Sequence, residues 1–261
     1  MSDVLLITGG ASGLGVETAR LAAARGHHVA INYRSRAAQA EALVAEITGK
    51  GGKAVALPGD VSREADIVRL FSETERLLGP LTGLVNSAGI GGGAHRVEDF
   101  DAAVLAELFA VNVTGLMLCC REAARRMSTR RGGPGGHKGG AIVNVSSMAA
   151  TIGGRSGKSP YAASKAAVDA FTVGFAKEVA REGIRVNSVR PGMVLTEMTE
   201  AALSDPAHRA DVEATIAMGR VGHAAEIASA ILWLLSAESS FVSGARLDAS
   251  GGGFVIGKTT G

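Results

Sequence analysis

The feature that most constrains this chain's fold is a glycine-rich turn near its beginning, the segment Thr8-Gly-Gly-Ala-Ser-Gly-Leu-Gly15. It lies between a short apolar run and a helical pattern. Gly9, Gly13 and Gly15 let the turn tighten, bring backbone N–H groups toward a pyrophosphate and allow the helix to pack closely on the strand. Such a turn between a first strand and a first helix favours dinucleotide binding over turn formation alone.

The rest of the chain alternates short apolar runs with longer helical patterns. The expected strands are 4–8, 28–33, 54–57, 81–86, 141–146, 185–189 and 245–249. The expected helices include 16–25, 37–48, 102–127, 161–181 and 224–236. This alternation predicts repeated β-α-β units. The fold class is therefore α/β, with a doubly wound, seven-stranded parallel sheet of the Rossmann type and helices on both faces.

Length alone admits one large domain or two small ones, since the chain has 261 residues. The motifs favour a single domain over 1–261, with a cofactor half at about 1–140 and a catalytic and substrate half at about 141–261. Two segments break the rhythm. We interpret the glycine-rich segment 130–140 as a surface loop, and 193–222 lies where a lid over a substrate is expected.

Charge and cysteine content exclude several classes of function. Lysine and arginine outnumber aspartate and glutamate by only 27 to 25, so no basic track for nucleic acid is present. The histidines lack metal-ligand spacing, so we expect no metal. Adjacent Cys119 and Cys120 are poorly placed for a bridge, which indicates a reducing compartment. The chain shows no signal peptide, and no stretch approaches 18 apolar residues. We expect a cytoplasmic protein without membrane partners.

The second half of the chain carries the residues expected to perform chemistry. Tyr161 and Lys165 lie four apart in a helical pattern, so their side chains share one face. A free phenol has a pKa of about 10, so a tyrosine acting as a base at neutral pH needs a nearby cation. Lys165 would supply that cation. Ser146 and Ser147 end the fifth expected strand, where a hydroxyl can hydrogen-bond a substrate carbonyl.

The end of the second expected strand bears on cofactor choice. Tyr33 and Arg34 lie about 20 residues beyond the glycine turn, where NAD-selective sites place an acid for the ribose 2′-hydroxyl. A guanidinium there can instead bind the 2′-phosphate of NADP, although a solvated cation leading the next helix is the alternative. Asp60, after the third strand, is placed to accept from the adenine amino group or to cap a helix beginning near Glu64. We expect NADP as cofactor, with NAD possible.

Over its whole length the chain resembles the classical short-chain dehydrogenase/reductase family. The motifs that carry the resemblance, in order, are Thr8-Gly-x-x-x-Gly-x-Gly15, Asn86-Ser-Ala-Gly89, Asn112, Ser147, Tyr161-x-x-x-Lys165 and Pro191-Gly192. Segments 141–148 and 185–193 look most like the glucose-1-dehydrogenase-like or 3-oxoacyl-carrier-protein-reductase-like branch. Two departures stand out: Ser87 replaces the usual second asparagine, and Ser12 stands where many NADP-dependent members carry a basic residue.

The resemblance implies a role for each matching residue. Tyr161 is the general acid/base, and Lys165 lowers its pKa and binds the nicotinamide ribose. Ser147, chosen over Ser146 by alignment, polarises the carbonyl, and Asn112 kinks its helix and holds a proton-relay water. The expected cofactor-binding residues are Gly9, Ser12, Gly13, Leu14, Gly15, Tyr33, Arg34, Asp60, Val61, Asn86, Ala88, Gly89, Tyr161, Lys165, Pro191, Gly192, Val194 and Thr196.

The expected function is an oxidoreductase that transfers hydride between NADP(H) and a carbonyl or secondary alcohol of a small substrate. A Rossmann methyltransferase is a weaker alternative, because it has no use for Ser147, Tyr161 and Lys165. A catalytically silent nucleotide sensor or scaffold would be free to lose these residues, yet this chain retains them. Sugar, quinone, acyl thioester and steroid substrates remain open.

Two helical segments, 115–127 and 161–181, carry more apolar residues than one buried face requires. Family members that resemble this chain pair these helices across a twofold axis. The segment 224–235, the last strand and the tail 254–261 are candidates for a second twofold contact. We therefore expect a homotetramer of D2 symmetry.

Overall fold

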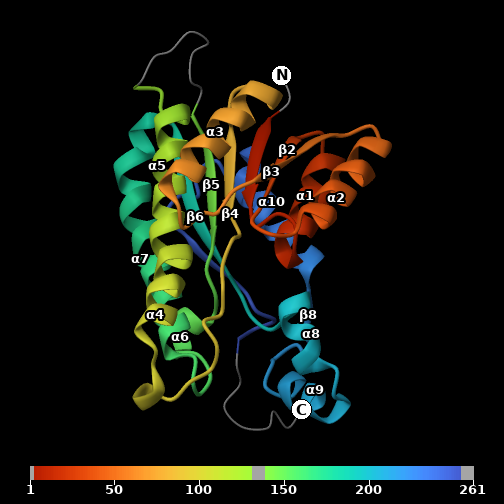
Figure 1. Cartoon of the computed structure of the whole chain (residues 1–261), viewed down its shortest axis with the longest axis vertical. Coiled ribbons are helices and arrows are strands. Elements are labelled where there is room, and N and C mark those ends of the chain that lie inside the picture. The colour runs from red at the N-terminus through yellow and green to blue at the C-terminus, as the bar shows by residue number, and fades with distance from the viewer. Residues whose placement is uncertain (1–2, 131–138, 254–261) are drawn as a thin grey trace.

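A computed structural model describes residues 3–130 and 139–253 of the chain (Figure 1). Its main sheet has seven parallel strands in the order β3-β2-β1-β4-β5-β6-β9. The strands are β1 (Val4–Thr8), β2 (His28–Tyr33), β3 (Lys53–Pro58), β4 (Gly83–Asn86), β5 (Gly140–Val145), β6 (Ile184–Pro191) and β9 (Arg246–Ala249). Strands β2 and β3 lie on one side of β1, and the chain then crosses to the other side of β1 to form β4, β5, β6 and β9. The predicted doubly wound Rossmann sheet is therefore confirmed.

Helices cover both faces of this sheet. One face carries α1 (Gly13–Ala24), α2 (Ala37–Gly49) and α10 (Ala224–Leu235), and the other carries α3 (Glu64–Leu78), α5 (Leu116–Met127) and α7 (Ser159–Val179). Strand β1 shows the consequence. Leu6 packs in one core cluster with Phe71, while its neighbours Leu5 and Ile7 pack in the other cluster with Ile231. Because both faces are covered, β1 is buried along its whole length rather than alternating between buried and exposed residues.

The segment 102–127, predicted as one helix, is divided. It consists of α4 (Ala102–Phe109), a π-helical turn η2 (Ala110–Gly115) and α5. Within the π turn, Asn112 is buried and its side chain bonds to the backbone of Ile90. Gly115 ends the turn against Val61, whose carbonyl oxygen would lie 2.2 Å from a Cβ at position 115. Widened turns of this kind are frequent at functional sites.

The same segment corrects our expectation about apolar stretches. Over an 18-residue window, Ala102–Met127 reaches a mean hydropathy of 1.9, so by length and composition alone it passes for a membrane span. In the fold it packs against the sheet and α3: Val111, Leu116 and Cys119 belong to the core. Packing in the core of this domain therefore accounts for part of the apolar composition, with 44% of that window buried.

The segment 193–222 forms a small unit below the carboxyl ends of the strands (Figure 1). It contains α8 (Glu197–Leu203) and α9 (Pro206–Glu213), and a two-stranded sheet of β7 (Val194–Leu195) and β8 (Gly222–His223) ties its ends together. Leu203, Val212 and Ile216 give it a core of its own. The lid role expected for this segment stays a prediction.

The shorter elements are α6 (Ala149–Ile152) and the 3₁₀ turns η1 (Val97–Asp99), η3 (Ala180–Glu182) and η4 (Ala237–Ser239). Most of the glycine-rich segment 130–140, whose loop character we predicted, lies outside the described residues.

Candidate active site

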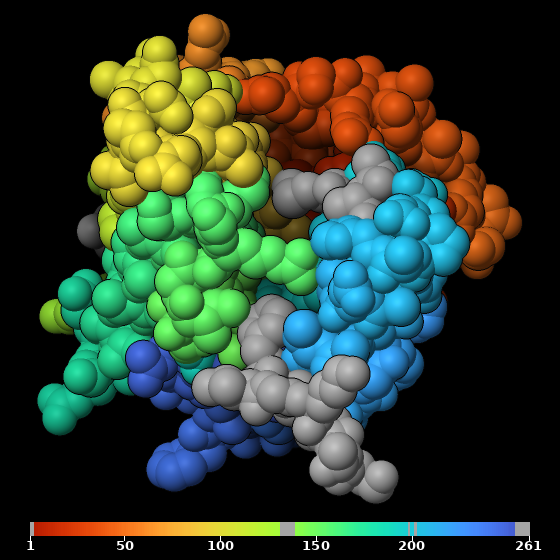
Figure 2. All heavy atoms as spheres, turned by 90° about the horizontal axis from the view of Figure 1, so that it is seen from below, coloured from red at the N-terminus to blue at the C-terminus, as the bar shows by residue number. Residues whose placement is uncertain are grey.

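A cleft opens at the carboxyl ends of the strands (Figure 2). Seen from below, segments around residues 100 and 155 border its hollow on one side, and the α8–α9 unit borders it on the other. Its main cavity encloses about 180 Å³. The lining residues are Ser12, Gly13, Leu14, Ser87, Gly89, Val145, Ser146, Ser147, Tyr161, Lys165, Pro191, Gly192, Val194, Thr196 and Thr199. Eleven of them are predicted site residues, brought together from five parts of the chain.

A second cavity of about 130 Å³ shares Gly89 with the first. It is lined by Gly9, Asn32, Arg34, Gly59, Asp60, Val61, Ala88, Gly89, Ile90 and Val111. Four predicted residues, Gly15, Tyr33, Asn86 and Asn112, line neither cavity. Asn86 lies in the interior, where its amide donates to Asn144 Oδ1 at 2.9 Å.

The glycine turn fits a dinucleotide. Gly9 has φ of 63°, and a Cβ there would lie 2.8 Å from Ala88 Cα. Within the described part of the chain, Ser12 at the N-cap of α1 makes no side-chain capping bond and the first turn of α1 has no acidic residue. The helix N-terminus therefore keeps N–H donors and a positive dipole end for a pyrophosphate. Among the described residues, no group of three His, Cys, Asp or Glu could hold a metal ion.

The hydroxyl groups at the end of β5 have different surroundings. Ser147 Oγ accepts from the Ala149 N–H at 3.1 Å, and Ser147 also hydrogen-bonds with the Tyr161 side chain. Ser146 is buried and donates instead to the Lys165 carbonyl at 3.1 Å. The geometry therefore places Ser147, and not Ser146, beside the phenol. Burial raises the pKa of Tyr161 above its usual value, and the hydrogen bond with Ser147 partly opposes this rise. The phenol is protonated at neutral pH.

Lys165 reaches the cleft from the same face of α7. Its Nζ donates to the Val145 carbonyl at 2.9 Å and lies 5.7 Å from the Tyr161 ring centroid. Burial lowers the pKa of Lys165 to about 8, while Asp169 acts to raise it. The ammonium is consequently the main form at pH 7. Lys165, which was expected to lower the pKa of Tyr161, is not among the causes of its shift, and burial raises that pKa.

Asn112 connects three segments. Its Oδ1 accepts from the Ile90 N–H at 2.8 Å, and its Nδ2 donates to the Ile90 carbonyl at 2.9 Å and to Ser164 Oγ at 3.1 Å. These bonds hold the exit of β4 and the start of α7 against η2. The relay water predicted at Asn112 stays a prediction.

Asp60 does not cap α3. The N-cap residue of that helix is Arg63. Asp60 Oδ1 accepts from the Ser62 N–H at 2.9 Å and from its hydroxyl at 2.7 Å, and the Asp60 N–H donates to Asp66 Oδ2. The helix-cap interpretation is therefore wrong. Asp60 lines the second cavity, where an adenine ring was predicted.

Arg34 also lines the second cavity, with its side chain 52% exposed. Its guanidinium lies 3.4 Å from Glu107 of α4. Arg36, two residues later, pairs with Glu197 and so connects the end of β2 to α8. Exposed pairs of this type contribute only about 0–1 kcal/mol, so a phosphate can replace Glu107 at small cost.

Two loops beside the cleft are hydrogen-bonded to each other. Lys158 Nζ donates to the carbonyls of Gly91 at 3.4 Å and Gly93 at 2.5 Å, and the His95 N–H donates to the Gly157 carbonyl at 3.2 Å. These contacts enclose a small pocket that Tyr161 also lines.

Sequence reasoning missed several residues of the site. Ser164 holds Asn112, Thr199 lines the cavity, and Asp169 acts on Lys165. Helical spacing could have revealed Asp169, because it lies four residues beyond Lys165 and eight beyond Tyr161. No local signal distinguishes Ser164 or Thr199, since each matters through a segment distant in sequence.

The comparisons with known proteins agree with this geometry. The family described as Enoyl-(Acyl carrier protein) reductase matches residues 9–253. The "Uncharacterized oxidoreductase YgfF" of Escherichia coli (strain K12) is 44% identical over 249 residues, covering 95% of this chain and 99% of that protein. The 3-oxoacyl-[acyl-carrier-protein] reductase of Synechocystis sp. is 32% identical and covers 96% of both chains.

Solved structures have the same fold. A blue fluorescent protein from a metagenomic library, in complex with NADPH, superposes with a TM-score of 0.87 at 29% identity. The superposition covers 96% of this chain and 97% of that one. The likeness therefore extends over nearly the whole chain.

Proposed function

The chain belongs to the classical short-chain dehydrogenase/reductase family and is an NAD(P)-dependent oxidoreductase acting on CH–OH or carbonyl groups, and from this premise we propose its mechanism and cofactor preference. Hydride passes between NADP(H) and a carbonyl or secondary alcohol of a small substrate. The observation that supports this proposal is the arrangement of Ser147, Tyr161 and Lys165 in the cavity that also contains the glycine turn.

Each catalytic side chain has a distinct task. The nicotinamide supplies or receives the hydride when bound. Tyr161, kept protonated by burial, donates its proton to the carbonyl oxygen during reduction and takes it back during oxidation. Ser147 hydrogen-bonds the same oxygen. The Lys165 ammonium stabilises the phenolate that forms, as an opposite charge favours an ionised neighbour.

Arg34 supports NADP over NAD. The segment Asn32 to Arg36 ends β2 without an acid that could accept from a ribose 2′-hydroxyl. The Arg34 guanidinium borders the cavity assigned to adenosine, where two charge-assisted bonds to a 2′-phosphate are possible. A structural relative was solved with NADPH.

The test is a binding and turnover panel with both cofactors. Binding of NADPH should change its fluorescence, and a responsive carbonyl from a panel of sugars, quinones, acyl thioesters and ketosteroids should then consume it, followed by absorbance. Tight binding with no turnover across the panel favours the silent nucleotide sensor, whereas absence of binding contradicts both proposals.

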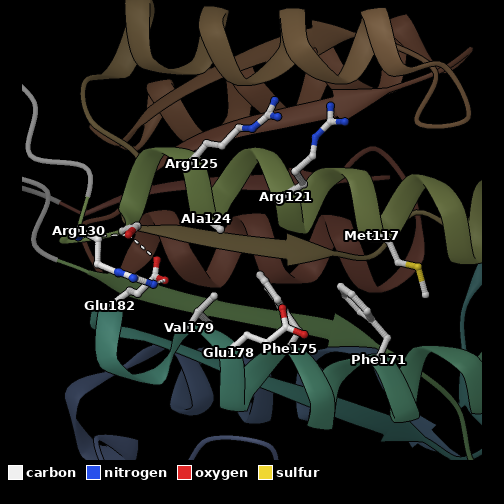
Figure 3. A pocket seen from close by; sticks show the side chains of 11 residues that line it. Met117, Arg121, Ala124, Arg125, Arg130, Phe171, Phe175, Glu178, Val179 and Glu182 are labelled. Carbon is white, nitrogen blue, oxygen red and sulfur yellow. Dashed lines mark hydrogen bonds and ion pairs between the residues drawn. The ribbon is translucent and has the colours of Figure 1, made fainter.

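The α5–α7 face supports self-assembly. A groove of about 670 Å³ runs between these helices, with Met117, Phe171, Phe175 and Val179 along it and arginines and glutamates at its edges (Figure 3). The two phenylalanine rings stack 5.2 Å apart. We propose that this groove forms the first twofold contact of a homotetramer. The tail expected at the second contact lies outside the described residues.

Light scattering at micromolar concentration tests the assembly. A mass of about four times the 26.4-kDa chain is expected. Introducing charge with Phe175→Glu should reduce it to a smaller species, and a monomeric wild type contradicts the proposal.

We also propose a cytoplasmic location. Cys119 and Cys120 are buried free thiols, and a reducing compartment keeps thiols in this form.

A further inference from the structure

Behind the catalytic lysine lies a buried carboxylate that the mechanism above does not use. Asp169 is one helical turn beyond Lys165 on α7, just as Lys165 is one turn beyond Tyr161. Residues four apart share a face of the helix. Lys165 and Asp169 are each only 5% exposed.

The nearest partner of this carboxylate is neutral. Ser188 of β6 donates its hydroxyl to Asp169 Oδ1 at 2.9 Å. Arg190, also on β6, is farther away, with 3.8 Å between its guanidinium and Asp169 Oδ2. Its Nε lies 2.7 Å from Asp248 of β9, and it donates to the Arg246 carbonyl at 3.2 Å. Arg190 is therefore directed mainly toward Asp248.

A buried carboxylate is costly unless a cation compensates it. The titratable and charged groups around Lys165 and Asp169 are Tyr161 on the same helix, Arg190 on β6 and Asp248 on β9. The charges alternate from Lys165 through Asp169 and Arg190 to Asp248, so the net charge of these four groups is zero. In this row, Asp169 is the anion one helical turn from Lys165 on α7.

We propose that Asp169, oriented by Ser188, is a positioning residue that keeps the Lys165 ammonium charged beside Tyr161. The catalytic consequence rests on the function proposed above, whereas the charge relation does not. Burial lowers the pKa of Lys165 to about 8, and the Asp169 carboxylate opposes that shift. Without this anion the lysine loses its proton at lower pH and the phenolate loses its counter-charge.

The test compares substitutions of the two residues that form the hydrogen bond between Ser188 and Asp169. Asp169→Asn keeps an acceptor for Ser188 and removes the charge, whereas Ser188→Ala removes the hydrogen bond and keeps the charge. Lys165 is titrated directly by NMR on protein labelled with ¹³Cε-lysine, its signal assigned through Lys165→Arg. The pH profile of kcat for carbonyl reduction is measured on the same variants.

We expect Asp169→Asn to move the Lys165 midpoint and the alkaline limb of kcat to lower pH. A midpoint about one pH unit lower corresponds to about tenfold lower kcat above pH 8 and little change at pH 6. Substrate KM should stay near the wild-type value. Ser188→Ala should move both midpoints much less.

A Lys165 midpoint that does not move in Asp169→Asn overturns the proposal, even if kcat falls. A midpoint that moves while the kcat profile stays in place upholds the charge relation and overturns the catalytic role of Lys165. If Asp169→Asn fails to fold, Asp248→Asn provides the test at a half-exposed position. It frees Arg190 to neutralise Asp169, so the Lys165 midpoint should still fall, and an unmoved midpoint again overturns the proposal.

Discussion

The two ends of the cleft are built by opposite means. The nucleotide end is shaped by side chains that are missing: a Cβ on Gly15 would lie 2.4 Å from the Gly9 carbonyl oxygen, and one on Gly9 would meet Ala88. The catalytic end is shaped by buried polar side chains, among them Lys165 and Asn112. The first end works through backbone N–H groups, and the second through contacts between distant segments.

This difference determines how each end responds to substitution. At the nucleotide end, added atoms displace backbone that carries the binding groups. At the catalytic end, removed atoms leave buried partners unsatisfied, because Asn112 bonds across 22 and 52 residues of sequence. Substitutions at the two ends should therefore separate binding from turnover.

The largest difference between the effect on turnover and the effect on nucleotide binding is expected for Tyr161→Phe. It removes the transferable proton but keeps the ring against its neighbours, so kcat should fall by about 10²- to 10⁴-fold. The dissociation constant for NADPH should stay within about twofold of wild type, since the phenylalanine ring keeps the cavity wall. Steady-state kinetics and fluorescence titration measure the two effects.

The control for Tyr161→Phe is Tyr33→Phe, at the other tyrosine of the chain, which was expected to bind the cofactor but lines neither cavity. It should retain turnover. Wild-type turnover in Tyr161→Phe would show that another group moves the proton, and the proposed division between the two ends would fail.

Arg34→Asp should give the next largest effect, confined to binding. Wild type is expected to prefer NADPH over NADH by about ten- to several-hundred-fold, since each charge-assisted bond contributes about 1.5–3 kcal/mol before exposure and salt reduce it. The substitution should reverse or abolish this preference. Dissociation constants for both cofactors measure it, with Arg36→Asp as the matched control. Equal binding by wild type, or an unmoved ratio, contradicts the role of Arg34.

The pH dependence of kcat for reduction should depend on groups at the catalytic end of the cleft and not on the nucleotide end. The Lys165 ammonium is present below its pKa of about 8 and is lost as the pH rises through that value. Above pH 8, kcat should therefore decline toward about tenfold per pH unit. Nucleotide binding at the glycine turn should change far less. A kcat that is flat from pH 7 to 10 would contradict the need for a charged lysine.

Gly13→Ala should give the smallest effect, at the nucleotide end. Gly13 has φ of 49°, and its Cβ would make only ordinary contact, 3.5 Å from Thr196. The left-handed conformation should cost about 1–2 kcal/mol in the free energy of unfolding. Gly26→Ala is the matched control, with φ of 87° and open space around it. Thermal unfolding should show similar losses, while only Gly13→Ala weakens NADPH binding. Equal affinities in both variants would contradict a binding role for this turn.

The sequence by itself determined the elements that depend on local chemistry. Strands buried on both faces appear as continuous apolar runs, and glycines must occupy a turn where a Cβ has no room, so the sheet and the nucleotide crevice are visible in the order of residues. The Tyr161 and Lys165 pair was also visible, because helical spacing is a local property.

Only the tertiary structure decided the features that depend on partners far along the chain. The apolar pattern over 102–127 predicted one helix, but the bonds of Asn112 to Ile90 and Ser164 accompany a π turn in its middle. The Asp60 carboxylate had two interpretations until the fold placed Arg63 at the helix cap. The role of Asp169 also depends on the fold, since β6 and β9 bring Ser188, Arg190 and Asp248 close to α7. The energetic effect of a buried charge depends on the groups that surround it.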